Sequence, residues 1–417
     1  MTGRHLHPSP ANAPSGVLAA FAAVALFVGT WTVLHVGFYR HTQIIDTPVY
    51  QRYGNEIAHG KVPYRDFELE YPPGALPTFA VPGVVSHGGH DQDVRPGFRR
   101  TFETLMWMCG ATALLAMAVV LRVAGGAVWT PLLFAALAPL ALGSVILSRF
   151  DLWPAALVAA ATAAVVSGRL RMGHVFLGIG AAAKFYPAVL LPLAAFYAWR
   201  RRGRREALLC VALTVGVAAL IFLPFVALAP AGVWHSISVQ LGRPLQVESL
   251  GASLLLAAHH AFGVGVTGET SHGSQNLAGT GADTVGVIST VVQAAALVWI
   301  WVAFARGPAT AVRFVAACAA AVCAFIAFGK VLSPQFLIWL LPVVPLVRGR
   351  RGLWASALLL VALVLTQIWF PFRYFRLALH FEAGLSWLLL ARDLTLVALA
   401  LLLATSLRRG AIRPESP

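Results

Sequence analysis

Apolar runs of roughly 17–25 residues recur along the whole chain, separated by short polar or basic segments. Such runs predict membrane-spanning helices, because backbone N–H and C=O groups inside a bilayer must be satisfied within their own segment. The runs do not alternate between apolar and polar positions, as the strands of a membrane β-barrel would. The pattern therefore predicts an all-α, polytopic helical membrane protein.

Basic clusters orient the predicted helices, because cytoplasmic loops carry an excess of arginine and lysine. The strongest cluster is Arg200-Arg201-Arg202-Gly203-Arg204-Arg205. The other clusters lie at 169–171, 306–313, 348–351 and 408–413. Placing all of them inside puts both termini in the cytoplasm and the first long loop outside.

About twelve transmembrane or re-entrant helices follow from this pattern. The complete spans are expected near residues 16–38, 102–122, 127–147, 152–167, 207–229, 284–305, 309–328, 333–347, 353–371 and 385–407. Two further segments do not cross completely. Residues 72–86 are short for a span and predict a re-entrant or interfacial helix. Residues 174–199 lie between two basic loops and break at Lys184-Phe185-Tyr186-Pro187, which predicts two half-helices.

The domain organisation expected from these spans is simple. Residues 1–15 are polar and proline-containing, which predicts a disordered cytoplasmic N-terminus. Residues 16–407 form a single transmembrane domain with extracytoplasmic loops near 39–101 and 230–283. Residues 408–417 form a cytoplasmic tail. The long first apolar run has no cleavage pattern after it, so an uncleaved first helix is expected.

Composition changes this picture little. The formal net charge of +15 raises the question of a nucleic-acid partner, but the arginines cluster at the ends of apolar spans, where orientation explains them. The cysteines, Cys109, Cys210, Cys318 and Cys323, all fall inside apolar runs and indicate buried thiols. We therefore expect no nucleic acid, no disulfide framework, no metal and no cofactor.

Half of the carboxylates lie in one segment. Eight of the 16 Asp and Glu residues fall between Asp46 and Glu103, in a chain that is 59% hydrophobic. Charges near lipid are costly, so such a cluster is expected in water or in a functional site. Asp46 directly follows the first apolar run, at the membrane surface. It is either a helix-terminal aspartate in water or a general base that takes a proton from an acceptor hydroxyl.

Lysine is rare, since only Lys61, Lys184 and Lys330 occur among 31 Lys and Arg residues. Lys330 lies between two predicted helices at the outer face and could bind a phosphate, or extend to the interface without a function. Lys184 either contacts the same phosphate or stabilises the bent hairpin. Arg243 is one of few arginines assigned outside, and it is a third candidate for phosphate binding.

Other polar groups leave alternatives open. Asp151 could cap the helix that follows it or belong to the site with Arg149. Arg392 and Asp393 predict a neutralised pair within the last helix. The loop histidines at 259, 260 and 272 fit no common zinc spacing and are expected in solvent.

Several of these residues form an ordered set. The set is Asp46 after the first helix, Gly60 with Pro63-Tyr64, Tyr71-Pro72-Pro73, Ala183-Lys184-Phe185-Tyr186-Pro187, Arg243-Pro244-Leu245-Gln246-Val247-Glu248-Ser249, and Ser333-Pro334-Gln335-Phe336 with Trp339 and Pro342. It resembles glycosyltransferase family 87, the polyprenyl-phosphate-mannose-dependent mannosyltransferases of actinobacteria, which have the GT-C membrane fold. The resemblance spans nearly the whole chain. Many GT-C enzymes have two adjacent acidic residues in the first outer loop, whereas this chain has Asp46 alone.

The resemblance implies an inverting hexosyltransferase, with mannose as the expected sugar, a polyprenyl-phosphate donor and a glycolipid or glycan acceptor. It implies Asp46 as the catalytic base, in a multi-pass protein of the plasma membrane whose site faces outward. Residues expected to shape the loop or the acceptor site are Tyr64, Glu68, Glu70, Tyr71, Asp151, Glu248 and Gln335. The alternatives are a secondary transporter, which would show repeat symmetry and midplane charges, and a non-catalytic lipid-binding protein of envelope assembly.

Overall fold

The computed structural model describes residues 13–40, 44–86 and 94–408. Within these ranges, six helices are long and apolar enough to cross a membrane. They are α1 (Ala13–Val33), α4 (Pro96–Ala124), α10 (Arg204–Leu228), α13 (Thr280–Ala305), α15 (Gly349–Trp369) and α17 (Ala383–Thr405). The predicted polytopic helical fold is confirmed.

Shorter elements complete the bundle. The apolar ones are α5 (Trp129–Leu142), α7 (Leu152–Val166), α8 (Leu170–Ala183), α12 (Leu250–Phe262) and α14 (Ala311–Ala327). The others are α2 (Thr47–Ala58), α3 (Pro77–Val85), α6 (Val145–Ser148), α9 (Leu191–Arg202), α11 (Pro230–Leu241) and α16 (Tyr374–His380), with 3-10 helices η2 (Gly37–Tyr39), η3 (Pro73–Ala75), η4 (Tyr186–Leu190) and η5 (Pro334–Leu340).

The outer helices present apolar side chains away from the protein. Only 11% of the apolar window of α10 and 17% of that of α13 are buried inside the molecule. A helix that is hydrophobic all round and remains uncovered by protein is typical of contact with lipid. The bundle is therefore built to sit in a membrane.

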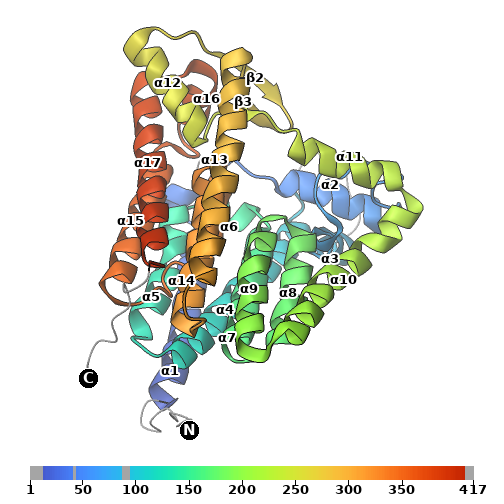
Figure 1. The fold of residues 1–417 in the computed structure, drawn as a ribbon. Helices are drawn as coiled ribbons and strands as arrows, with labels where there is room; N and C mark the ends of the chain where they lie inside the picture. The colour runs from blue at the N-terminus through green and yellow to red at the C-terminus, as the bar shows by residue number, and fades with distance from the viewer. Residues whose placement is uncertain (1–12, 41–43, 87–93, 409–417) are drawn as a thin grey trace, which may run out of the picture.

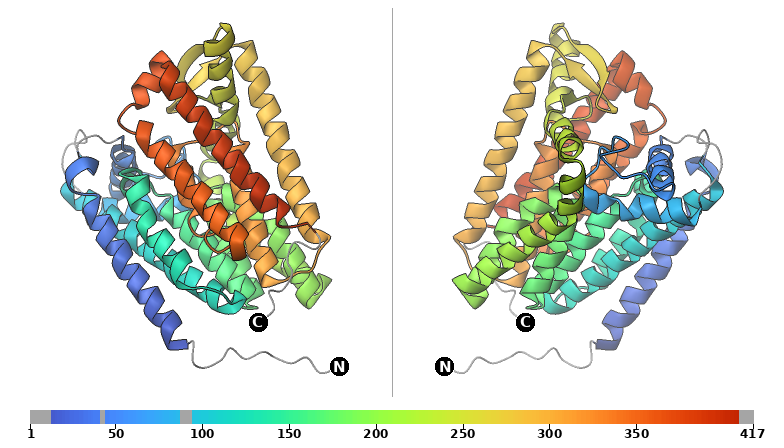
Figure 2. Two further views of the ribbon diagram at one scale, coloured as in Figure 1. Left: turned by 90° about the vertical axis from the view of Figure 1, so that its left-hand side faces the viewer. Right: turned by 90° about the vertical axis from the view of Figure 1, so that its right-hand side faces the viewer.

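Figure 1 shows α12, α16, β2 and β3 gathered at one end of the bundle, whereas α1 begins at the opposite end. The side views in Figure 2 show α13 and α17 extending past the other helices toward this end. The three strands β1 (Leu245–Gln246), β2 (Thr267–Ser271) and β3 (Ser274–Ala278) form an antiparallel sheet in the order β1-β3-β2. The 230–283 loop therefore carries two helices and a sheet, which the sequence pattern did not reveal.

The first long loop is folded onto the bundle. Helices α2 and α3 cross where two glycines meet, since a Cβ on Gly83 would lie 2.3 Å from the Gly54 carbonyl oxygen. The Arg95 N–H at the start of α4 donates to Gln51 Oε1 of α2 at 2.8 Å. These contacts fix α2 and with it Asp46, which immediately precedes α2. The nine residues of α3 reach only about 13 Å, which is too short to cross a bilayer.

The segment at 174–199 divides into α8 and α9, and α8 ends at Lys184, where the break was predicted. The segment at 333–347 differs from its prediction as a helical span. It forms η5 followed by turns, because Pro334, Pro342 and Pro345 lack the N–H donors that an α-helix needs. Residues 337–346 are all buried, so protein rather than lipid surrounds this irregular backbone. Disorder is predicted for residues 1–15, whereas α1 already begins at Ala13. Residues 1–12 lie outside the described residues, as do 409–417 of the predicted tail, Asp91 and Asp93.

Candidate active site

Four chain segments bring polar side chains together beneath the sheet. Asp46 precedes α2, residues 149–151 join α6 to α7, Lys184 ends α8, and residues 243–248 include β1. These segments are far apart in the sequence, and each contributes at least one charged group. The charged groups are Asp46, Arg149, Asp151, Lys184, Arg243 and Glu248.

Asp46 forms an ion pair with Arg149 through its Oδ2 atom. The Asp46 side chain is 26% exposed, whereas that of Arg149 is 8% exposed, so one side of the carboxylate remains open. The Tyr50 hydroxyl donates to the same oxygen at 3.3 Å from one turn along α2. Burial lowers the pKa of Arg149 to about 10, which still leaves it charged at neutral pH. The guanidinium thus orients the Asp46 carboxylate.

Asp151 occupies a different environment and is 1% exposed. Its Oδ1 atom accepts from Lys184 Nζ at 2.6 Å and from Trp339 Nε1 at 2.6 Å. It lies at the N-cap position of α7 but makes no side-chain cap hydrogen bond, so the capping alternative is wrong. The carboxylate joins α7, α8 and η5 instead.

Aromatic rings enclose the buried ion pair of Asp151 and Lys184. Trp339 is stacked between Tyr186 and Phe336, with ring centroids 4.1 Å and 4.0 Å away. The Lys184 ammonium lies 4.8 Å from the Phe150 ring centroid and 5.0 Å from that of Trp339. Such cation–π contacts favour a charged ammonium in a site with little water.

Glu248 lies on the sheet side of the site and is 2% exposed. Its Oε2 atom accepts from Gln246 Nε2 at 2.6 Å, and the same amide donates to Ser333 Oγ at 2.9 Å. Burial raises the pKa of Glu248 to about 8, although Arg392, Arg149 and Arg243 oppose the shift. At neutral pH this carboxyl is therefore mostly protonated.

The charges leave an excess of positive groups. Three basic side chains, Arg149, Lys184 and Arg243, lie close enough to perturb one another or the same neighbours. Of the carboxyl groups beside them, Glu248 has a raised pKa and adds little negative charge at neutral pH. Among the described residues, the buried Nε atoms of Arg149 and Arg243 have no hydrogen-bond partner. Unsatisfied buried guanidinium donors beside an open carboxylate are suited to an anionic ligand.

Other predicted site residues lie around this centre. Tyr71 packs its ring 5.0 Å from that of Phe150 and so borders the site, while Tyr64 is buried and donates to the Tyr71 carbonyl at 2.6 Å. Glu68 and Glu70 are exposed on the same loop. Lys330 is half-buried, and its ammonium donates to the Leu241 carbonyl at 3.1 Å, beside the end of α11.

Gln335 is half-buried in the first turn of η5. Arg392 and Asp393 form the predicted pair at 2.8 Å, fully buried in α17. The Arg392 guanidinium also donates to the Glu248 carbonyl at 2.8 Å, which connects α17 with the site.

Two contributors were not among the predicted site residues. Arg149 was noted only as a neighbour of Asp151, and Trp339 only as part of an ordered motif. The signal for Arg149 was a cation two residues from an aspartate at a helix junction, in a chain where only 11% of residues are charged. Nothing in the sequence identified Asp46 as its partner, because the five α-helices from α2 to α6 lie between the two residues.

The described residues contain no group of three or more His, Cys, Asp or Glu side chains that could hold a metal ion. Comparison with known protein families gives one match, in which the profile described as Glycosyltransferase family 87 covers residues 69–334. This range includes Asp151, Lys184, Arg243 and Glu248, while Asp46 and Trp339 lie outside it. No curated protein matches the chain.

Proposed function

We propose that this chain, which belongs to glycosyltransferase family 87, moves a hexose, with mannose as the expected sugar, from a polyprenyl-phosphate donor to a glycolipid or glycan acceptor. Family membership makes it a membrane glycosyltransferase. One observation carries the finer proposal: a partly exposed carboxylate, Asp46, lies against a cluster of cations with unsatisfied donors. A sugar phosphate and an acceptor hydroxyl are the two chemical groups that such a site suits.

The proposed reaction needs only groups of this kind. The Asp46 carboxylate takes the proton of the acceptor hydroxyl, whose oxygen attacks the anomeric carbon from the face opposite the phosphate. The bond between the anomeric carbon and the phosphate oxygen breaks, and the electron pair leaves with the polyprenyl phosphate. Cations placed at the phosphate stabilise the charge that develops there, and inversion follows from the geometry of attack.

Asp46 is favoured over Asp151 as the base because of access. Asp46 keeps an exposed edge, whereas Asp151 is buried and accepts two hydrogen bonds on one oxygen. A general base must come within hydrogen-bond reach of its substrate. We therefore assign Asp151 the task of holding Lys184, and we propose Lys184, Arg149 and Arg243 as the groups nearest the phosphate.

An apolar groove beside the site supports a lipid-linked donor. A cavity of about 530 Å³ lies between the outer ends of α5 and α15, lined by Phe38, Leu140, Val364, Ile368 and Phe372, with Arg373 at its edge. Arg373 of the lining is followed by Tyr374, which lies close enough to Arg149 and Glu248 of the candidate active site to interact with their charges. We propose that the polyprenyl tail lies here while its phosphate reaches the cations, and that this site faces the extracytoplasmic side of the plasma membrane.

The proposal is tested with membranes of an overexpressing strain and radiolabelled polyprenyl-phosphate mannose. The expected result is transfer of the label to an endogenous glycolipid or glycan. Membranes that contain Asp46→Asn protein at equal abundance serve as the control. Label that crosses the membrane without being transferred would support a transporter instead.

Two of the phosphate contacts expected from the sequence, Arg243 and Lys330, can be ranked. Arg243→Gln is expected to raise the KM for the donor by roughly tenfold or more, because it removes a charged donor whose Nε atom is buried and unsatisfied. Lys330→Ala is expected to raise it less, but more than Lys61→Ala, since Lys61 pairs with Glu56 in a solvated loop. Steady-state kinetics with varied donor give all three values. A larger effect for Lys330→Ala than for Arg243→Gln would indicate that the phosphate binds nearer to Lys330 and the end of α11.

Donor affinity is expected to fall as the pH rises through the pKa of Glu248, which is about 8. Below this value the carboxyl is neutral, and above it a negative charge appears beside Arg243 and opposes the phosphate. The donor KM measured between about pH 7 and pH 9 should therefore rise. Glu248→Gln stays neutral throughout and should flatten the profile, and an unchanged profile in this variant would assign the dependence to another group.

A further inference from the structure

A second polar pocket lies apart from Asp46, between the end of α1 and the beginning of α4. It has a volume of about 330 Å³ and is lined by Trp31, Trp107, His35, Arg99, Arg100 and Glu103. None of these residues belongs to the candidate active site. The pocket therefore needs an explanation of its own.

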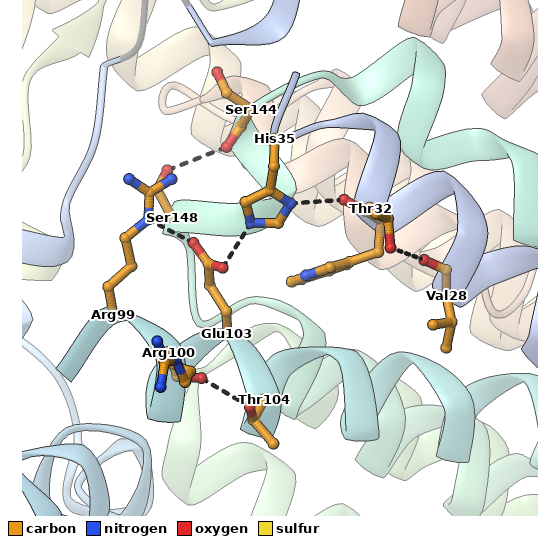
Figure 3. A network of polar contacts seen from close by, with 10 residues as sticks. Val28, Thr32, His35, Arg99, Arg100, Glu103, Thr104, Ser144 and Ser148 are labelled. Carbon is orange, nitrogen blue, oxygen red and sulfur yellow. Dashed lines mark hydrogen bonds and ion pairs between the residues drawn. The ribbon is translucent and has the colours of Figure 1, made fainter. Parts of the chain in front are cut away.

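Glu103 is the centre of the polar network in this pocket, as Figure 3 shows. Its Oε2 atom lies 2.7 Å from His35 Nε2, and its Oε1 atom accepts from Arg99 Nε at 2.7 Å. The other ring nitrogen, His35 Nδ1, lies 3.0 Å from the Trp31 carbonyl oxygen. The carboxylate is thus held by His35, just past the end of α1, and by Arg99 of α4.

Basic side chains outnumber acidic ones in this pocket. Arg99, Arg100 and His35 line it together with one acidic side chain, Glu103. Among the described residues, Glu103 contacts only Arg99 and His35, so it leaves the Arg100 guanidinium without a partner.

Arg100 has a guanidinium that is available to bind a ligand. Its side chain is exposed, and its guanidinium makes no hydrogen bond or ion pair with the rest of the described chain. It lies on the pocket wall next to Arg99, whose own bond to Glu103 uses only the Nε atom. The pocket therefore offers several free guanidinium N–H donors to an anion, and phosphate accepts from such donors particularly well.

The position of the pocket matches the level of lipid headgroups. The apolar window of α1 ends at Val33, just before His35, and Arg99 and Arg100 lie near the start of α4. Trp31 and Trp107 flank the polar groups, as tryptophan does at membrane interfaces. Toward the bilayer the two helices close, because a Cβ on Gly110 would lie 2.3 Å from Phe27 Cζ.

We propose that this pocket binds the phosphate headgroup of an anionic bilayer lipid that is not a substrate. Arg100 and Arg99 donate to the phosphate, and the acyl chains lie against the exposed side chains of Val28 and Met108 below it. The start of α4 also holds α2 through the bond from the Arg95 N–H to Gln51. A bound lipid therefore stabilises the helix that positions Asp46.

The test uses the purified full-length protein in nanodiscs of phosphatidylcholine, to which phosphatidylglycerol is added in steps. Native mass spectrometry of the released protein counts the bound lipids. Arg100→Gln is expected to weaken retention of one phosphatidylglycerol by roughly fivefold, and Arg99→Gln with Arg100→Gln by more. Arg52→Gln removes an exposed arginine on the neighbouring α2 and should leave retention unchanged.

Three outcomes would overturn the proposal. One is equal retention by the wild type and the Arg99→Gln/Arg100→Gln variant, and another is equal retention of phosphatidylcholine and phosphatidylglycerol. The third is protection from unfolding by inorganic phosphate alone in phosphatidylcholine nanodiscs, which would indicate a site for free phosphate. Thermal unfolding in phosphatidylcholine checks that the variants fold. If the double variant does not fold, lipid retention by the single Arg100→Gln variant decides the test, because Arg100 is exposed.

Discussion

Asp46→Asn is expected to lower the turnover number by about 10²–10⁴-fold, the usual contribution of a positioned acid or base. Asparagine keeps the size and shape of the side chain but cannot take the proton of the acceptor hydroxyl. Donor binding should change little, because Arg149, Lys184 and Arg243 all remain. Single-turnover kinetics over a range of donor concentrations separates the two quantities, because the plateau gives the rate of the chemical step and the half-saturation point gives donor affinity.

Matched controls come from the same loop. Glu68→Gln and Glu70→Gln remove the charge of exposed carboxylates and should cost much less activity than Asp46→Asn. If Asp46→Asn keeps near-wild-type turnover while Asp151→Asn abolishes it, the base is misassigned. The buried carboxylate between Lys184 and Trp339 would then be the group to study.

Lys184→Met is expected to lower the free energy of unfolding by about 3–5 kcal/mol, because it leaves the carboxylate of Asp151 buried without its cation. Methionine has a similar length and no charge, so the loss of stability measures the broken ion pair and not the creation of a cavity. Unfolding of the purified protein by denaturant in detergent measures it. Lys61→Met, which disrupts the pair between the exposed Lys61 and the half-buried Glu56, should change stability by less than about 1 kcal/mol.

The double variant Lys184→Met/Asp151→Asn separates stability from activity. Neutralising both partners removes the unpaired charge, so most of the lost stability should return. Activity should not return, since the phosphate would still lack the Lys184 ammonium. Recovery of both quantities together would show that Lys184 only supports the fold.

The long helices could be predicted from the sequence because lipid imposes a length and an apolar composition on each of them. α10, α13 and α17 lie within a few residues of the expected spans. The break at Lys184 was also predictable, since a lysine followed by a proline interrupts both hydropathy and helix geometry. Such local signals do not depend on what packs against the segment.

Pairings between distant segments were not predictable. The Asp151 side chain was expected either to cap α7 or to belong to the site, and only the fold shows that it binds Lys184 and Trp339. The sheet over residues 245–278 has short strands whose pairing depends on contacts across the loop. For 333–347 the apolar composition was visible, but hydropathy alone does not distinguish a helix from a buried irregular segment.

The irregular segment at 334–347 also has a consequence for biosynthesis. A chain that leaves backbone groups unpaired cannot enter lipid alone, so this segment must wait for the helices that surround it, α7, α14 and α15. It carries Trp339, the indole donor to Asp151. A nascent chain that ends at α14 therefore contains the proposed base, Asp46, and its neighbouring cations, but it lacks the 334–347 segment that packs against Lys184. Activity should appear late in synthesis, once α15 has closed over the segment.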